Sequence, residues 1–350
     1  MKPGRLTILE REAYHRLVRP VLFRMWRGDP ERVHEATISA LERLPATRTP
    51  ARHAPVEVAG IRFPNRVGLA AGMDKDGTAA AAWARLGFGF AELGTVTGQP
   101  QPGNEKPRIF RLPASRAIIN RMGFNNDGAA ALAATLTAAG VRRGNNALGI
   151  PLGISIGKTR SVPLEHALDD YLVSLRHVAR HADYVAINVS SPNTPGLRRL
   201  QGAEEIATLI GALAQEARRI DNVPVPIFVK LAPDLDPRAV AESVAVVEDG
   251  GAAGFIATNT TLRREGIDAG EDHLGQQAGG LSGAPLTTRA LRFVEELCSL
   301  TTLPVMGVGG IMTPADASRM FDAGASLVQL YTGFIYEGPA LVRGIHEMGS

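Results

Sequence analysis

The sequence predicts an α/β protein, a (β/α)8 TIM barrel with an N-terminal amphipathic helical hairpin. It contains eight short runs rich in Val, Ile, Leu, Ala and Gly, with helical patterns between them and two amphipathic stripes ahead of them. Nearly continuous apolar strands that alternate with helices indicate a parallel sheet covered on both faces. Eight such units in 350 residues fit a closed barrel, whose chemistry lies at the C-terminal strand ends.

We expect the hairpin over 1–48 and the barrel over 49–350. The first stripe of the hairpin is apolar at helical spacing: Leu6, Leu9, Ala13, Leu17, Val21 and Met25. A second stripe follows Asp29, a predicted N-cap, with Pro30 at the first helical position. The pair either packs on the barrel or turns an outer apolar face toward a bilayer surface.

The barrel elements follow in order from residue 66. The predicted strands are 66–72, 90–96, 147–157, 184–190, 226–232, 254–260, 304–310 and 326–332, and helical patterns cover 78–86, 164–180, 203–219, 238–249 and 314–322. Long connections at 98–125 and 191–202 are expected to be functional or disordered, and 261–282 is expected to be a mobile loop. A doubly wound open sheet is the alternative, but no dinucleotide fingerprint follows the first strand.

Composition and charge exclude several classes of protein. The single cysteine, Cys298, excludes disulfides and cysteine zinc sites, and we expect no metal. No apolar run is long enough for a spanning helix. Residues 1–53 hold 11 Lys/Arg against 6 Asp/Glu, whereas the rest of the chain is slightly acidic. This argues against nucleic acid as a partner and for an N-terminal segment that meets an anionic surface.

Several predicted strand ends carry polar residues. Lys230 lies in an apolar strand and is costly to bury unpaired, so it either forms a structural ion pair or faces negative charge in a pocket. The glycines of 307–310 and the Tyr331-Thr332 pair favour a phosphate-bearing cofactor over a simple turn.

Amides and one serine complete the candidate site. The asparagines at loop or strand-end positions are Asn120, Asn188, Asn193 and Asn259. Amides that converge at one barrel mouth suit a planar ring with alternating donors and acceptors. Ser191 is the candidate base, and since no histidine lies at an evident strand end, a hydrolytic triad is disfavoured.

Six motifs resemble the dihydroorotate dehydrogenase family, class 2, the quinone-dependent type. They are Ala-Ala-Gly-Met-Asp-Lys, Ile-Asn-Arg-Met-Gly-Phe-Asn, Asn-Val-Ser-Ser-Pro-Asn-Thr, Val-Lys-Leu-Ala-Pro-Asp, Gly-Gly-Leu-Ser-Gly and Leu-Val-Gln-Leu-Tyr-Thr. The resemblance covers essentially the whole chain. It implies an FMN enzyme of pyrimidine biosynthesis that oxidises (S)-dihydroorotate to orotate and passes electrons to a membrane quinone, ubiquinone or menaquinone.

The resemblance also implies roles for individual residues. Ser191 would remove the C5 proton, while His34 and Arg111 would contact the quinone. The substrate would be held by Lys75, Asn120, Arg121, Met122, Gly123, Phe124, Asn188, Asn193, Asn259 and Thr260. FMN would be held by Ala71, Gly72, Met73, Asp74, Lys75, Thr95, Ser155, Asn188, Lys230, Thr258, Gly283, Gly310, Tyr331 and Thr332.

Two details bear on these roles. Class 1 relatives use a cysteine base, whose ordinary pKa is about 8.5; Cys298 lies far from the Ser191 loop, which supports class 2. An isolated serine is a far weaker base than a cysteine. We therefore expect Thr194 or an ordered water to relay the proton, with turnover rising toward alkaline pH. Ser155 replaces the asparagine usual in the family, which puts one flavin or substrate contact in doubt.

The remaining expectations concern setting and alternatives. We expect a monomer, peripheral to the cytoplasmic face of the inner membrane of a bacterium, because no organellar presequence precedes the helix pair. One alternative is a soluble flavin barrel linked to NAD or fumarate, which would not need the amphipathic hairpin. Another is a non-catalytic barrel that binds a nucleotide, against which Lys75, Ser191, Lys230 and the asparagines argue.

Overall fold

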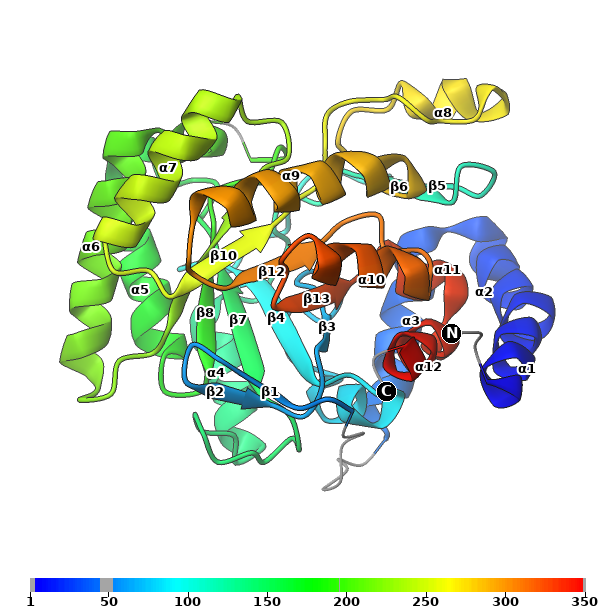
Figure 1. Ribbon diagram of the computed structural model, residues 1–350, viewed down its shortest axis with the longest axis horizontal. Coiled ribbons are helices and arrows are strands. Elements are labelled where there is room, and N and C mark those ends of the chain that lie inside the picture. Colours follow the sequence, from blue (N-terminus) through cyan, green and yellow to red (C-terminus); the bar gives the residue numbers. More distant parts are fainter. Residues whose placement is uncertain (1–3, 45–52, 195, 349–350) are drawn as a thin grey trace.

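The computed structural model, which describes residues 4–44, 53–194 and 196–348, contains the predicted closed barrel (Figure 1). Its strands are β3 (Val67–Leu69), β4 (Phe90–Val96), β7 (Leu152–Ile156), β8 (Tyr184–Asn188), β9 (Ile227–Leu231), β10 (Gly254–Ala257), β12 (Val305–Val308) and β13 (Leu327–Leu330). Neighbouring strands are parallel, and β10 and β9 close the ring. All eight predicted strands are confirmed, and each contains only buried residues, which explains their continuous apolar pattern.

A short hairpin that the sequence did not predict lies at one end of the barrel. β1 (Val56–Val58) and β2 (Ile61–Phe63) pair antiparallel. Phe63 packs edge-on against Phe90 of β4, with ring centroids 5.1 Å apart. The interior at this end is filled by apolar and aromatic side chains, so this end of the barrel is a packed core.

The outer helices largely agree with the prediction. They are α5 (Ala167–Val178), α6 (Ala203–Ile220), α7 (Pro237–Asp249) and α10 (Pro314–Asp322). The predicted helix over 78–86 is a 3-10 helix, η3 (Ala80–Leu86). The predicted helical ranges do not include α4 (Ala129–Ala138), α9 (Thr287–Leu300) or α12 (Pro339–Met348).

The insertions form a second sheet beside the barrel. β5 (Ile109–Leu112) and β6 (Ala117–Asn120) make a hairpin, and β11 (Gly280–Gly283) pairs antiparallel with β6. The segment 261–282 was expected to be a loop, but besides β11 it contains a 3-10 turn, Ala269–Glu271, and α8 (Asp272–Gly275). Arg264 holds the segment together by donating to the carbonyls of Gly275, Gln277 and Gly279.

The N-terminal hairpin consists of helical pieces that lie against the C-terminal helices (Figure 1). They are α1 (Arg5–Ala13), a π-helical turn (Tyr14–Val18), α2 (Arg19–Arg24), a 3-10 turn (Met25–Gly28) and α3 (Pro30–Glu42). Asp29 caps α3 as predicted, and its carboxylate accepts from the backbone N–H groups of Glu31 and Arg32. The predicted domain boundary after residue 48 lies outside the described residues.

Buried carboxylates attach the inner face of the hairpin to the barrel. Glu337, on α11 (Thr332–Glu337), accepts from Arg11 at 2.8 Å, lies 3.0 Å from His15 and pairs with Arg116 at 2.6 Å. Glu31 of α3 forms a buried ion pair with Arg108 at 2.7 Å. Such pairs fix a geometry more than they add stability, because both partners lose their hydration. The hairpin is therefore docked at defined points.

The outer face of the same hairpin is apolar and open. Leu6, Leu9, Leu17 and Val21 are 71%, 65%, 68% and 59% exposed. They belong to the first predicted stripe, whose other members, Ala13 and Met25, are exposed as well, so the stripe faces away from the barrel. Within the described part of the chain, no helix combines the length and apolar character needed to cross a membrane.

Candidate active site

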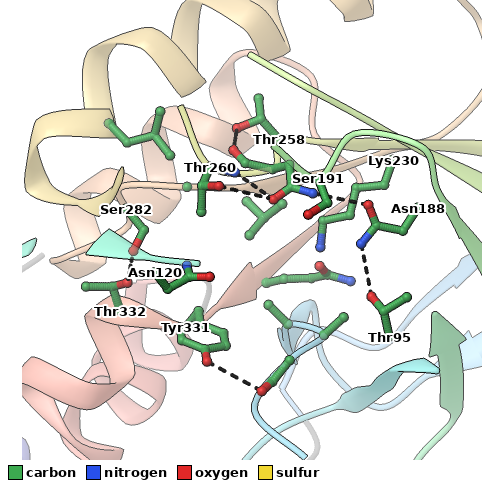
Figure 2. A pocket seen from close by; sticks show the side chains of 18 of the residues that line it. Thr95, Asn120, Asn188, Ser191, Lys230, Thr258, Thr260, Ser282, Tyr331 and Thr332 are labelled. Carbon is green, nitrogen blue, oxygen red and sulfur yellow. Dashed lines mark hydrogen bonds between the residues drawn. The ribbon is translucent and has the colours of Figure 1, made fainter. Parts of the chain in front are cut away.

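A cavity opens at the C-terminal ends of the barrel strands, and Figure 2 shows its polar side chains pointing inward from several elements. The sequence-predicted residues that line it are Ala71, Gly72, Lys75, Thr95, Asn120, Met122, Gly123, Phe124, Asn188, Ser191, Asn193, Lys230, Thr258, Asn259, Thr260, Gly283, Gly310, Tyr331 and Thr332. Most of them lie at or just after the ends of barrel strands, because parallel strands all end at the same rim, and the others come from β6, β11 and the segment after β6.

The four predicted asparagines converge on this cavity and are hydrogen-bonded in two pairs. The Asn259 amide donates to the Asn188 carbonyl at 3.2 Å, and the Asn193 amide donates to that of Asn120 at 3.3 Å. Asn188 also donates to the Thr95 hydroxyl at 2.9 Å. Mutual bonds of this kind fix each amide's orientation, which leaves a preorganised set of donors and acceptors for a planar ligand.

Ser191 lies in the loop after β8, and its hydroxyl oxygen faces the cavity beside Lys230 (Figure 2). The backbone N–H of Asn193 donates to the Ser191 Oγ at 3.3 Å. Thr194 is buried, and its hydroxyl makes no hydrogen bond to any described residue. No histidine is among the residues that line this cavity. The arrangement therefore suits a serine that moves a proton and lacks the partners of a nucleophilic triad.

Lys230 of β9 is one of two cations in the cavity. The side chain is buried, and its ammonium lies 3.7 Å from the carboxylate of Glu92 on β4. The two explanations offered by the sequence, an ion pair and a cation facing the pocket, both describe its position. At 3.7 Å the pair is too long for a hydrogen bond, so the ammonium keeps its donors for a ligand.

Lys75 is the second cation and comes from the loop after β3. It donates to the Asn125 carbonyl oxygen at 2.6 Å. Burial, with a smaller contribution from the Arg108 charge, lowers the pKa of Lys75 to about 8. A buried ammonium that titrates near neutrality is poised to bind an anion, whose charge replaces the lost hydration.

A corner of the cavity combines glycine backbone with hydroxyl groups. Gly310 has φ +67°, and a Cβ there would lie 2.3 Å from the backbone of Thr287, so only glycine fits. The Ser282 and Thr332 hydroxyls lie 2.8 Å apart at this corner. Exposed backbone N–H groups and hydroxyls at the ends of the seventh and eighth barrel strands are typical of a phosphate site.

Four predicted residues do not line the cavity. Asp74 turns inward to accept from Ala79 N–H and Trp83 Nε1, which shapes the loop after β3. Ser155 lies behind Thr95, 2.9 Å from its hydroxyl, so it reaches the cavity only through that residue. The Arg121 side chain turns away toward the carbonyls of Pro107 and Ala278, and Met73 lines a different pocket.

That other pocket lies between the hairpin and the barrel and is mainly apolar. His34 and Arg111, the predicted quinone contacts, both line it, together with Met73. Burial, assisted by the charge of Lys75, lowers the pKa of His34 to about 4. Arg111 donates to the carbonyls of Phe23 and Gly28, so it also holds the hairpin turn. The pocket thus offers a neutral imidazole and one guanidinium in apolar surroundings.

Sequence reasoning missed several residues of the site. Among them are Ser282, Gln329 and the cavity partner Asn125. Asn125 ends a motif whose preceding residues were singled out, so a signal was present. No group of three His, Cys, Asp or Glu side chains within the described ranges is arranged to hold a metal ion.

The chain is similar to known proteins over nearly its whole length. A family described as Dihydroorotate dehydrogenase matches residues 53–348. Relatives named "Dihydroorotate dehydrogenase (quinone)" include one from Salinispora arenicola, 55% identical over 94% of this chain and 97% of its own, and one from Chloroflexus aurantiacus, 51% identical over 94% of each. A crystal structure of DHODH from Eimeria tenella in complex with ferulenol is 36% identical, with a TM-score of 0.83 over 91% of this chain and 90% of that one.

Proposed function

The chain belongs to the dihydroorotate dehydrogenase family, and we propose that it oxidises dihydroorotate to orotate in pyrimidine biosynthesis, with FMN as bound cofactor and a quinone as electron acceptor. The observation that carries this proposal is the cavity itself. One part of the cavity contains two lysines, four oriented amides and a serine, with no histidine among the lining residues. The adjoining corner contains Gly310 and the hydroxyl groups of Ser282 and Thr332. That set suits a flat anion on one side and a phosphate on the other.

The residues present fit FMN. A phosphate suits the backbone at Gly309 and Gly310, with Thr332 beside it, and a ring suits the space walled by Ala70, Thr95 and Lys230. When bound, FMN supplies a hydride acceptor that can pass electrons on singly or in pairs. Lys230 offers positive charge for the negative charge that such a ring gains on reduction.

Orotate and dihydroorotate fit the amide cluster and Lys75. Their ring presents alternating N–H and C=O groups, which the amides of Asn120, Asn193 and Asn259 can match as donor or acceptor. Their carboxylate suits the Lys75 ammonium, because burial destabilises the charged form of this side chain and a bound anion would stabilise it. These residues bind and orient the substrate and keep water from its ring.

Ser191 removes the C5 proton of the substrate in this proposal. Its oxygen accepts from Asn193 N–H, which fixes the hydroxyl while leaving its own hydrogen free to be passed on. Thr194, with its buried and unpaired hydroxyl, is the predicted next step of the relay. A serine base depends on such an outlet, because its own alcohol is a poor proton acceptor.

The apolar pocket under the hairpin is proposed as the quinone site. His34 is neutral at physiological pH, since its pKa is lowered to about 4, so it can hydrogen-bond a quinone oxygen without adding charge. Arg111 supplies a fixed guanidinium at the same pocket. Asn120, Met122 and Tyr331 line both this pocket and the polar cavity, so the two sites share a wall.

We further propose that residues 1–48 form a membrane-facing unit of a monomeric, peripheral membrane protein at the cytoplasmic face of a bacterial inner membrane. The support is the exposed apolar stripe over the quinone pocket and the basic charge of the segment. Either ubiquinone or menaquinone is compatible with the pocket.

An anaerobic experiment tests the proposal. The purified protein is mixed with dihydroorotate while the visible flavin absorbance is followed, and then a soluble quinone or NAD is added. Bleaching by dihydroorotate with recovery by quinone alone is expected. Recovery by NAD would keep the substrate and reassign the apolar pocket, whereas absence of bleaching would overturn the substrate assignment.

A further inference from the structure

A second buried charge lies one layer below the polar cavity. Glu92, on β4, is fully buried inside the barrel. Its Oε2 accepts from the Tyr184 hydroxyl at 3.0 Å and from Gln329 Nε2 at 2.7 Å. Its Oε1 lies 3.7 Å from the Lys230 ammonium and accepts no hydrogen bond from any described residue. The carboxylate is thus held on one oxygen and directed at Lys230 with the other.

The group joins four barrel strands at the cavity floor. Glu92 comes from β4, Tyr184 from β8, Lys230 from β9 and Gln329 from β13. Lys230 and Gln329 line the cavity, whereas Glu92 and Tyr184 do not. Lys230 and Gln329 therefore stand between Glu92 and any ligand, and of these two only Lys230 carries a charge. Glu92 can act on a ligand only through these side chains or through its electrostatic field.

The apolar surroundings make the burial of this carboxylate unfavourable in free energy. The Tyr184 ring packs against Phe90 and Phe228, with centroids 6.4 Å and 5.3 Å away. A buried ion pair is seldom more stabilising than apolar side chains of the same volume. Apolar side chains, such as those that fill the deeper layers of the barrel, would fill the cavity floor without this desolvation cost. A role in the site accounts for a charge that the fold alone does not require.

We propose that Glu92 is a positioning residue that acts through Lys230 and sets the net charge beneath the bound flavin. This inference rests on the proposed FMN site. With Glu92 present, the Lys230 charge is balanced and the ammonium is held at the cavity floor. Without the carboxylate, an unbalanced positive charge remains beside the ring. Since two-electron reduction adds negative charge to the flavin, that imbalance favours its reduced form.

The test is the midpoint potential of the bound flavin in the full-length holoenzyme. Glu92→Gln keeps the shape and both accepted hydrogen bonds but removes the charge. We expect the midpoint potential of its flavin to rise by about 30 mV, which for a two-electron couple is a roughly tenfold shift of the equilibrium toward the reduced form. An anaerobic dye-coupled titration with a chemical or enzymatic reductant measures this without dihydroorotate or quinone.

Tyr184→Phe is the matched control. It removes one hydrogen bond from the same carboxylate, keeps the aromatic packing and leaves the charge in place. Its potential is expected to stay within a few millivolts of wild type, roughly a 1.3-fold change in the equilibrium. A Glu92→Gln potential equal to that of wild type, or a shift of equal size in Tyr184→Phe, would overturn the proposal.

A double variant keeps the test decisive if Glu92→Gln does not fold. Glu92→Gln with Lys230→Gln leaves no unbalanced charge, so it should recover folded protein that the single variant loses. Failure of both to fold would show that Glu92 acts otherwise than through Lys230. The proposed function fails separately: wild-type protein without flavin, or flavin that dihydroorotate cannot reduce, would count against it.

Discussion

The polar cavity and the apolar pocket share a wall and differ in nearly every other property. The cavity is enclosed by barrel strand ends and presents amides, hydroxyls and two ammonium groups. The pocket lies between the hairpin helices and the barrel and presents mainly aliphatic and aromatic side chains, with His34 and Arg111 among its polar groups. Asn120, Met122 and Tyr331 belong to both.

The difference teaches how one chain can serve two unlike reactants. A flat anion must exchange its hydration for matched hydrogen bonds, so its site is built on rigid strand ends. An apolar quinone is driven into its pocket by burial of its surface and needs few oriented partners. The two half-reactions should therefore respond to different substitutions, and each prediction below separates them further.

The largest effect is expected from Ser191→Ala. Loss of a general base typically slows the chemical step by about 10²- to 10⁴-fold, and nothing else in the cavity can take its place. FMN and orotate should still bind, because Ser191 holds neither. Stopped-flow measurement of flavin reduction by dihydroorotate checks this, with orotate affinity measured in parallel.

Ser191→Cys is the informative companion to that variant. A thiol has an ordinary pKa of about 8.5 and accepts a proton more readily than an alcohol. Flavin reduction in this variant should fall well short of the loss seen with alanine. Equal loss in both variants would mean that the hydroxyl's hydrogen bonding, and not its basicity, is what the reaction needs.

The next effect concerns the apolar pocket. Thr37 of α3 lines it, and Thr37→Phe places a ring in the space proposed for the quinone. We expect the KM for a soluble quinone to rise by about tenfold, equivalent to about 1.4 kcal/mol, with anaerobic flavin reduction within twofold of wild type. Ser39→Phe, on the exposed side of the same helix, is the control and should change neither rate. Slower flavin reduction in Thr37→Phe would contradict separate sites.

The sequence predicted the polar cavity well because its residues lie at strand ends. Near-continuous apolar runs located the eight strands, and the polar residues within or just beyond these runs revealed Asn188, Ser191, Lys230 and Asn259. A parallel barrel brings such ends together whatever the loops do. The conformation of the loops was therefore not needed to predict which residues meet at the strand ends.

The sequence did not show in which direction individual side chains point, or which strands far apart in the chain pair with each other. Asp74 and Lys75 are neighbours, yet one turns inward to Trp83 and the other into the cavity. The pairing of β6 with β11 joins segments that are far apart in the chain. Glu92 could have been found, since it interrupts an apolar strand just as Lys230 does.

A smaller effect is expected from the titration of Lys75, whose pKa burial lowers to about 8. Its charge is present below that pH and lost above it, so dihydroorotate should bind a few-fold more weakly as pH rises from 7 to 9. The limiting rate of flavin reduction should rise over the same range, because proton removal by Ser191 becomes easier. Measuring that rate against substrate concentration at each pH separates the two trends.

Lys75→Arg provides the control for that pH dependence. A guanidinium stays charged throughout this range, so the rise in apparent dissociation constant near pH 8 should disappear while the limiting rate still climbs. Persistence of the same rise in Lys75→Arg would assign it to another group. A limiting rate that is flat with pH in both proteins would count against proton removal as the slow event.

The smallest effect on chemistry is expected from the outer face of the hairpin. Leu9→Ser with Leu17→Ser replaces two side chains that are 65% and 68% exposed and face away from the apolar pocket. Exposed substitutions of this kind shift stability by about 0.5 kcal/mol or less, so turnover with a soluble quinone should be unchanged. Binding to anionic vesicles should fall by tenfold or more, since each leucine contributes roughly 1.5–3 kcal/mol when buried in lipid.

Val223→Ser is the control for this variant. Val223 is 70% exposed and distant from the hairpin, so its substitution should leave vesicle binding intact. Unchanged vesicle binding in the double variant would leave the apolar pocket as a quinone site reached from solution, and would remove the reason for an outward apolar stripe above it.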